Sequence, residues 1–176
     1  IIVGQNIYFS KDDILNIEKF FDSYNCVISV EHLSNLNCRG TIKTYPITEA
    51  CDRELFASFC PDLVISLGNN IVSASLKPSI RNCSRDCEHW QIDPAGRVRD
   101  MFDCLTTVFE CTISEFFQFF TSEVTTQSDK KYYNLWKETL SILQFPETGF
   151  TDFFVVKKIA EVLPKHSLLH TAILNS

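Results

Sequence analysis

The segment from residue 61 to residue 100 constrains the fold of this chain more than any other part of the sequence. A mainly apolar run at residues 63–67 ends at Gly68, a helical pattern follows, and a second strand-like run occupies residues 88–93. An Asp-Pro-x-Gly-Arg turn then begins at Asp93. Two strands joined by a helix form the repeating unit of a parallel α/β sheet, so this segment predicts that architecture.

The remainder of the chain continues the alternation of strands and helices. Further strands are predicted at residues 1–4, 26–30, 41–45 and 105–109. Helices are predicted after Ser10, around Leu55, from Asn69-Asn70 onwards, and over residues 113–120, 132–143 and 152–163; the last is expected to begin at Thr151 or Asp152 and to be buried through Val156, Ile159, Ala160 and Leu163. We therefore predict a three-layer, Rossmann-like α/β domain, in which a mostly parallel sheet of five to six strands has helices on both faces.

The composition is that of an ordinary globular domain. Of the 176 residues, 45% are hydrophobic and 22% are charged, and the net charge of −6 does not favour binding to nucleic acid or to an anionic membrane surface. No apolar run approaches the roughly 20 residues that span a bilayer, and no signal peptide is recognisable. We therefore expect a cytoplasmic protein with neither a nucleic-acid nor a membrane partner.

The eight cysteines bear on this expectation, because disulfides are typical of oxidising compartments. Several of them lie within apolar strand or helix patterns, where a free cysteine behaves as a small hydrophobic residue. We interpret all eight as reduced. Cys83 and Cys87 have a spacing that suits two zinc ligands, but no second Cys or His pair accompanies them at finger spacing, so no metal site is predicted.

Candidate binding residues lie where the strands end, because ligands of doubly wound sheets bind beyond the carboxyl ends of the strands. The dinucleotide fingerprint G-x-G-x-x-G is absent, since no two of the five glycines are close together. Gly4 and the pair Gly68-Asn69 either offer backbone N–H groups to a phosphate or simply let each strand turn into its loop. We favour the second interpretation.

Asp93 and the arginines around it allow two interpretations as well. Asp93 lies where an acidic residue often binds a ribose hydroxyl, but Asp-Pro is also a good turn starter. The arginines either bind a planar anion or pair with neighbouring carboxylates, and we favour pairing. The arginines are Arg81, Arg85, Arg97 and Arg99, and the carboxylates are Asp86, Asp93 and Asp100.

Several motifs resemble one enzyme family. They are PDLVISLG at residues 61–68, IVS at 71–73, HWQIDPAGR at 89–97, IVGQ at 2–5, LSN at 33–35, and the closing segments at 163–164 and 174–176. In this order they resemble the middle domain of thiamine-diphosphate-dependent enzymes, and in particular the 2-succinyl-5-enolpyruvyl-6-hydroxy-3-cyclohexene-1-carboxylate (SEPHCHC) synthases of menaquinone biosynthesis. The resemblance spans the whole chain.

The resemblance implies a parent transferase with three α/β domains, in which thiamine diphosphate and Mg²⁺ are held between the first and third domains of paired chains. The parent would decarboxylate 2-oxoglutarate and add the succinyl unit to isochorismate. The Gly-Asp-x motif with a downstream Asn that holds Mg²⁺ is not found here, so this part would bind no cofactor and be inactive alone. Its partners would be the flanking N- and C-terminal domains of the same chain, in a homodimer or homotetramer.

Two departures from the family pattern concern the acceptor substrate. Where the family often has a basic pair after the Gly68 strand, this chain has Ala74 and Ser75. The closing Asn175-Ser176, whose serine the resemblance places near the acceptor, follows Leu174 instead of the usual Gly or Ala. Without the basic pair, charge that would bind acceptor carboxylates is lost, so the resemblance implies a parent that uses a related acceptor.

The two ends of the sequence suggest a piece of a longer polypeptide, because both are apolar and strand-like whereas chain termini usually fray at the surface. We expect residues 1–166 to form the central domain and residues 167–176 to begin the next. Two other hypotheses remain. One is a regulatory domain that binds a nucleotide or pathway metabolite in its strand-end cleft; the other is a stand-alone Rossmann-type enzyme, which the missing fingerprint disfavours.

Overall fold

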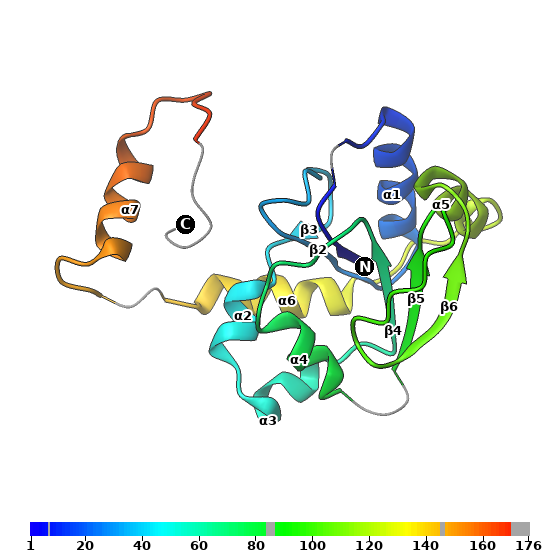
Figure 1. Ribbon diagram of the computed structural model, residues 1–176, viewed down its shortest axis with the longest axis horizontal. Helices are drawn as coiled ribbons and strands as arrows, with labels where there is room; N and C mark the ends of the chain where they lie inside the picture. Colours follow the sequence, from blue (N-terminus) through cyan, green and yellow to red (C-terminus); the bar gives the residue numbers. More distant parts are fainter. Residues whose placement is uncertain (7, 84–86, 145–146, 170–176) are drawn as a thin grey trace. The chain divides into compact units, whose positions relative to one another are not determined.

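The fold is seen in a computed structural model that describes residues 1–6, 8–83, 87–144 and 147–169. The chain divides into two compact units, Ile1–Leu143 and Gln144–Ser176. The first unit contains a six-stranded sheet with the order β3-β2-β1-β4-β5-β6, in which every neighbouring pair of strands is parallel (Figure 1). The predicted α/β class is confirmed.

The strand order places β1 in the middle of the sheet. The strands are β1 (Ile2–Val3), β2 (Ile28–Val30), β3 (Thr41–Ile42), β4 (Leu63–Leu67), β5 (Glu88–Ile92) and β6 (Leu105–Phe109). The chain builds outward from β1 to β3 and then returns to the other side of β1, where β4 pairs with it. The order therefore reverses between β1 and β4, which is where sheets of this kind bind their ligands.

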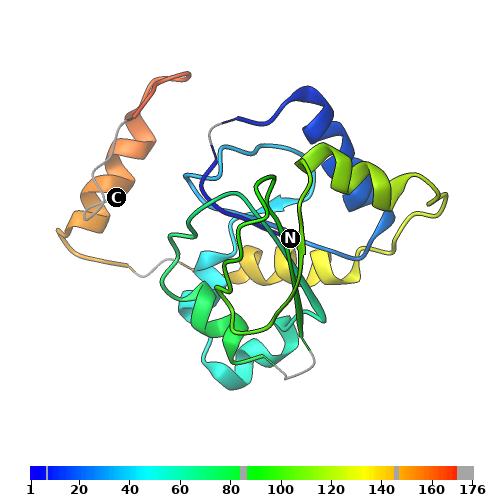
Figure 2. The same cartoon turned by 45° about the vertical axis from the view of Figure 1, so that its right-hand side comes forward.

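Helices cover both faces of the sheet and complete three layers (Figure 2). One face packs against α1 (Lys11–Ser23) and α5 (Ile113–Thr121); the other packs against α2 (Tyr45–Ala50), α3 (Arg53–Phe56), the 3-10 turn η1 (Ala57–Phe59), α4 (Leu76–Arg81) and α6 (Lys131–Ile142). Alternation along β1 produces the two cores, because Val3 enters the first and Ile2 the second. The first core is strongly aromatic, with the rings of Phe20 and Phe117 packed edge to face at 5.1 Å.

The two helices of the first face begin at capping boxes. The Ser10 hydroxyl accepts the Asp13 N–H, and the Asp13 carboxylate accepts the Ser10 N–H; Thr112 and Glu115 do the same for α5. This arrangement satisfies backbone donors that have no partner within a helix and places negative charge at the positive end of the helix dipole. The start predicted after Ser10 is confirmed.

The helix predicted to begin at Asn69-Asn70 was placed too early, because α4 begins at Leu76. The N–H groups of Val72 and Ser73 instead hydrogen-bond to the carboxylate of Glu31, which lies far away in the sequence. Because the distant Glu31 side chain satisfies these two N–H groups, they take no part in the helix, which begins after them.

The second unit contains α7 (Asp152–Val162). The hydroxyl of Thr151 accepts the Phe154 N–H at 3.3 Å, so the predicted start is confirmed. The predicted burial of α7 was wrong: none of its residues is buried, and Val156 and Ile159 are 47% and 42% exposed. Among the described residues of this unit α7 is the one regular element, so the unit lacks a second layer against which to bury it. The strand predicted at residues 167–174 lies mostly outside the described residues.

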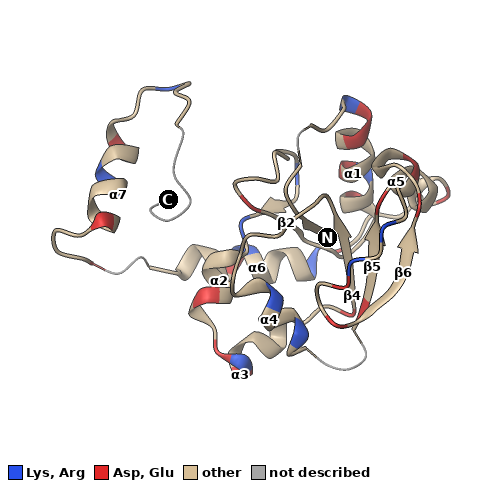
Figure 3. Ribbon diagram, in the orientation of Figure 1, with Lys and Arg blue, Asp and Glu red and all other residues tan. Residues whose placement is uncertain are grey.

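Charged residues of both signs are interspersed along the first unit (Figure 3). Within the described part of the chain, no helix is both long and apolar enough to cross a membrane. Over the same residues, no group of three or more His, Cys, Asp or Glu side chains is placed to hold a metal ion.

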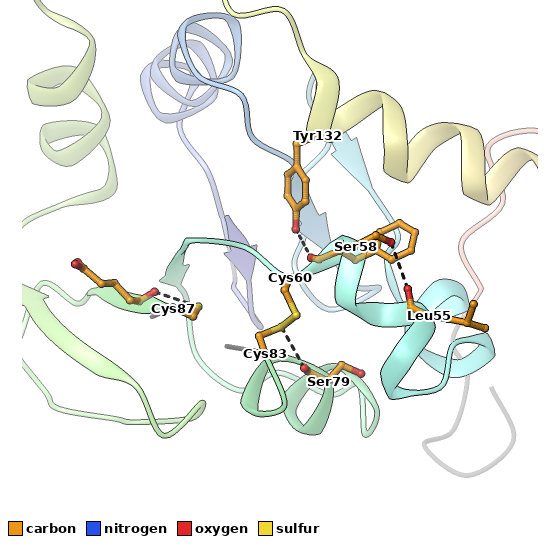
Figure 4. Close-up of a disulfide and its surroundings, with 9 residues drawn as sticks. Leu55, Ser58, Cys60, Ser79, Cys83, Cys87 and Tyr132 are labelled. Carbon is orange, nitrogen blue, oxygen red and sulfur yellow. Dashed lines mark hydrogen bonds between the residues drawn. A yellow bond between two sulfur atoms is a disulfide. The ribbon is translucent and has the colours of Figure 1, made fainter. Parts of the chain in front are cut away.

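The interpretation of all eight cysteines as reduced was wrong for two of them. Cys60 and Cys83 form a disulfide, with their Cα atoms 5.4 Å apart (Figure 4). Cys60 follows η1 and Cys83 follows α4, so the fold brings the ends of two helical segments together on the same face of the sheet. The other six cysteines are free.

Replacing both Cys60 and Cys83 by Ser should lower the free energy of unfolding by about 3 kcal/mol. The bridge joins two residues 23 positions apart and so restricts the conformations open to the unfolded chain. Urea unfolding under non-reducing conditions measures this difference. Cys51→Ser is the matched control, since Cys51 is free. Equal unfolding midpoints for the double variant and the control would contradict the prediction, as would free thiols at both positions by peptide mapping.

A polar pair lies inside the sheet between β4 and β5. The Ser66 hydroxyl lies 2.7 Å from His89 Nε2, and the two side chains are 1% and 0% exposed. The carboxylate of Asp100 lies 3.9 Å from the other ring nitrogen. Although these are the residue types of a hydrolytic triad, substrate cannot reach a hydroxyl this deeply buried, so we interpret the pair as a structural contact in the core.

His89 should make the protein less stable in acid. Burial lowers the pKa of its imidazole from the ordinary 6.5 to about 4, although Asp100 partly opposes the shift. Between these two values the unfolded state binds a proton that the folded state does not, so the free energy of unfolding falls as the pH decreases from 6.5 to 4, by at most about 3 kcal/mol.

Urea unfolding of the wild type and of His89→Gln at pH 7 and pH 4.5 measures this effect. The glutamine does not titrate, so the variant should lose less stability than the wild type between the two pH values. Equal losses for the two proteins would show that His89 is not the group responsible.

Candidate functional site

The candidate site is the carboxyl edge of the sheet at the point where the strand order reverses. There the strand ends at Gly4 and Gly68 lie against each other. A Cβ atom on Gly4 would lie 2.6 Å from the carbonyl oxygen of Asn69, and a Cβ atom on Gly68 would lie 3.0 Å from that of Gln5. Gly68 also has a φ of +81°, which favours glycine. Both glycines are therefore required by the close approach of two loops.

Backbone hydrogen bonds join these loops directly. The Gly4 N–H donates to the Leu67 carbonyl at 2.9 Å, the Gln5 N–H to the Asn70 carbonyl at 2.7 Å, and the Asn69 N–H to the Gln5 carbonyl at 2.8 Å. A phosphate bound at this edge would need free N–H groups, and these three are already donated within the chain. The geometry supports the interpretation of Gly4 and Gly68 as turn and packing residues.

Asp93 is the centre of a charged cluster beside these loops. Its carboxylate is 2% exposed and accepts hydrogen bonds from the Ala95 N–H at 2.9 Å, from Arg97 Nε at 3.2 Å and from Arg99 Nη2 at 2.7 Å. Burial alone raises the pKa of this carboxyl, but the hydrogen bonds and the two guanidinium charges outweigh burial and lower it. Asp93 is therefore ionised at neutral pH and already paired.

Arg99 connects this cluster to the loop after β4. Its guanidinium donates to the Asn69 side chain at 3.3 Å and lies 3.5 Å from the Gly68 carbonyl oxygen. Gly4, Gly68, Asn69, Asp93 and Arg97, which the sequence predicted as one cleft, thus lie along one edge of the sheet. Of the other predicted arginines, Arg81 pairs with Asp103 at 3.1 Å, and Arg85 lies outside the described residues.

Ala74 and Ser75 lie further along the same loop, just before α4. Ala74 is exposed. The Ser75 hydroxyl lies 2.8 Å from the hydroxyl of Thr48, a residue of α2. Asn175 and Ser176, the other residues expected near the acceptor, lie outside the described residues.

Sequence reasoning did not predict the side-chain contacts of two residues, Gln91 and Glu31, that organise this edge. The Gln91 side chain accepts the Arg99 N–H at 2.9 Å and donates to the Arg97 carbonyl at 2.6 Å, which fixes the arginine turn. A glutamine at a buried position of β5 was the available signal. Glu31 holds the loop after β4 through Val72 and Ser73, and no local pattern indicates a contact across 41 residues.

No known family model matches the chain. Among curated proteins it is similar to SEPHCHC synthases: 29% identical to that of Bacteroides thetaiotaomicron over 98% of this chain, 32% identical to that of Flavobacterium johnsoniae over 96%, and 29% identical to that of Phocaeicola vulgatus over 81%. The chain spans only 31%, 31% and 26% of these relatives, respectively. The resemblance expected from the motifs is confirmed: over most of its length, this chain is similar to a part of the SEPHCHC synthases.

Proposed function

We propose that this chain is the middle domain of a SEPHCHC-synthase-like transferase, which decarboxylates 2-oxoglutarate and adds the succinyl unit to isochorismate or a related acceptor. The observation that carries the proposal is similarity to these synthases over 96–98% of the chain. The all-parallel sheet with its reversal of order between β1 and β4 agrees with a domain that borders a ligand at its carboxyl edge.

Thiamine diphosphate and Mg²⁺ belong, in this proposal, to other domains of the whole protein. Mg²⁺ prefers carboxylate oxygens that are free to coordinate it, but the Asp93 carboxylate is occupied by two arginines. The described residues therefore do not fit the cofactor. We assign to them the support of the flanking domains and the shaping of one wall of the substrate site, and we expect this chain alone to be inactive.

The residues of the loop after β4 support the part of the proposal that names a related acceptor. From Gly68 to Ser75 it contains no charged residue, and Ala74 is exposed at the position where a basic pair would lie. An acceptor with several carboxylates would find no cation on this segment. In the proposed function the whole protein therefore binds isochorismate weakly, or prefers an acceptor with fewer negative charges.

The whole protein, supplied with thiamine diphosphate and Mg²⁺, should release CO₂ from 2-oxoglutarate and form an adduct with isochorismate, measured by mass spectrometry. Ala74→Lys should lower the KM for isochorismate roughly tenfold, because a charge-assisted hydrogen bond to a carboxylate is gained. Ala50→Lys adds the same charge at an exposed position at the end of α2 and is the control. Absence of turnover with 2-oxoglutarate would contradict the proposed function.

A second candidate function is binding of a nucleotide or an acidic metabolite at the strand-end cleft. It is favoured by the Arg97 guanidinium, because this side chain is 62% exposed and bonds Asp93 through Nε. An anion could be bound bidentately by such a group.

Titration calorimetry of this chain with ATP and with 2-succinylbenzoate, as an acidic product, tests the second function. Saturable binding with a Kd in the micromolar range, weakened about tenfold or more by Arg97→Ala, would support it. Flat titrations would contradict it.

A further inference from the structure

One carboxylate outside the Asp93 cluster makes two short hydrogen bonds at the same edge of the sheet. Glu31 follows β2 directly. Its Oε2 atom accepts the Val72 N–H at 2.6 Å and its Oε1 atom accepts the Ser73 N–H at 2.7 Å, so each oxygen holds one backbone donor. Hydrogen bonds to an ionised acceptor are about twice as strong as those between neutral groups.

These bonds hold the second half of the loop at residues 69–75. The first half is fixed by backbone bonds to Gln5 and by Arg99. Val72 and Ser73 come before α4 begins at Leu76, so hydrogen bonds of that helix do not satisfy their N–H groups. Through Glu31, this half of the loop is therefore tied to the end of β2, which is separated from β4 by β1 in the sheet.

The bond to Ser73 extends the anchor towards the helix and α2. The Ser73 hydroxyl accepts the Leu76 N–H at 3.2 Å and lies 3.3 Å from the Ser75 hydroxyl, which in turn contacts Thr48. Displacing the Ser73 backbone would disturb each of these contacts. The path of the loop, including the exposed Ala74, thus depends on the side chain of Glu31, which comes more than 40 residues earlier in the sequence.

We propose that Glu31 is a positioning residue for the acceptor substrate. The loop it holds follows β4 at the reversal of strand order, where ligands of such sheets bind. Glu31 does not touch the reacting atoms; it keeps residues 69–75 in the form that borders the acceptor. The inference rests on the proposed function, and it adds a determinant of acceptor binding that carries its effect through the backbone.

Glu31→Gln in the whole protein tests this role. A glutamine has one acceptor oxygen, and its NH₂ group would face the second backbone N–H, so one of the two bonds is lost. If the loop holds its binding-competent form in only a tenth of the molecules, the apparent affinity falls by that fraction. We expect the KM for the acceptor to rise about tenfold, with kcat and the KM for 2-oxoglutarate within about twofold of the wild type.

Glu115→Gln is the matched control. The Glu115 carboxylate also accepts two short bonds, from the N–H and the hydroxyl of Thr112 at 2.8 and 2.7 Å, but it caps α5 instead of holding the loop after β4. It should cost similar stability and leave the KM for the acceptor unchanged. Glu31→Asp, which keeps the charge on a shorter side chain, should give a smaller rise than Glu31→Gln.

Hydrogen exchange, followed by mass spectrometry of peptides covering residues 69–75, measures how firmly Glu31 holds the loop, independently of enzyme activity. Exchange there should be faster in Glu31→Gln and unchanged in Glu115→Gln. Unchanged exchange in Glu31→Gln would overturn the inference whatever the activity, and so would an equal rise of the KM in both variants. A wild-type protein without turnover would instead contradict the proposed function, and the exchange result would still decide whether Glu31 holds the loop.

Discussion

The carboxyl edge of this domain depends on the direct contact between the backbones that follow β1 and β4. Because Gly4 and Gly68 have no side chains, the two loops approach closely enough to exchange three hydrogen bonds with each other or with the strand ends. A crevice that in related architectures receives a phosphate is thereby closed by the protein's own backbone. A ligand at this edge must therefore lie against side chains of the loops, outside the backbone contact.

The carboxylates of the same edge have their hydrogen-bonding partners within the chain. The buried Asp93 carboxylate is paired with Arg97 and Arg99, and the Glu31 carboxylate is satisfied by two backbone donors. A buried carboxylate that lost its partners would cost several kcal/mol, so these pairings are maintained by the folded state. Carboxylates that are already hydrogen-bonded within the chain stiffen the loops they hold, and they are poorly placed to coordinate a cofactor or to transfer protons. The chemistry of the edge agrees with a supporting role.

Much of this fold could be predicted from local pattern. The strands at residues 63–67 and 105–109 were predicted with the bounds of β4 and β6, because continuous apolar or β-branched runs between turn residues leave few alternatives. Topology then predicted a shared edge for Gly4, Gly68 and Asp93. What failed was non-local: the start of α4 is delayed by Glu31, and Cys60 meets Cys83 only in the folded state. Whether α7 is buried could not be predicted from its periodicity, because the pattern specifies an apolar face but not what covers that face.

The internal pairing of Asp93 also bears on whether the edge is a regulatory site. An anion approaching Arg97 and Arg99 must compete with a carboxylate that is already bound at 3.2 and 2.7 Å. Only interactions beyond those already made with Asp93 would contribute to affinity, and they would come from Arg97, whose side chain is 62% exposed and bonds Asp93 through Nε, because the unpaired Nε of Arg99 is buried. A carboxylate or a phosphate approaching from solvent would therefore contact the exposed Arg97 and would not reach the buried Arg99 Nε. The neutral loop at residues 69–75 adds no cation to help either one. The physical balance at this edge therefore favours shaping of a neighbouring site over tight binding of an anion.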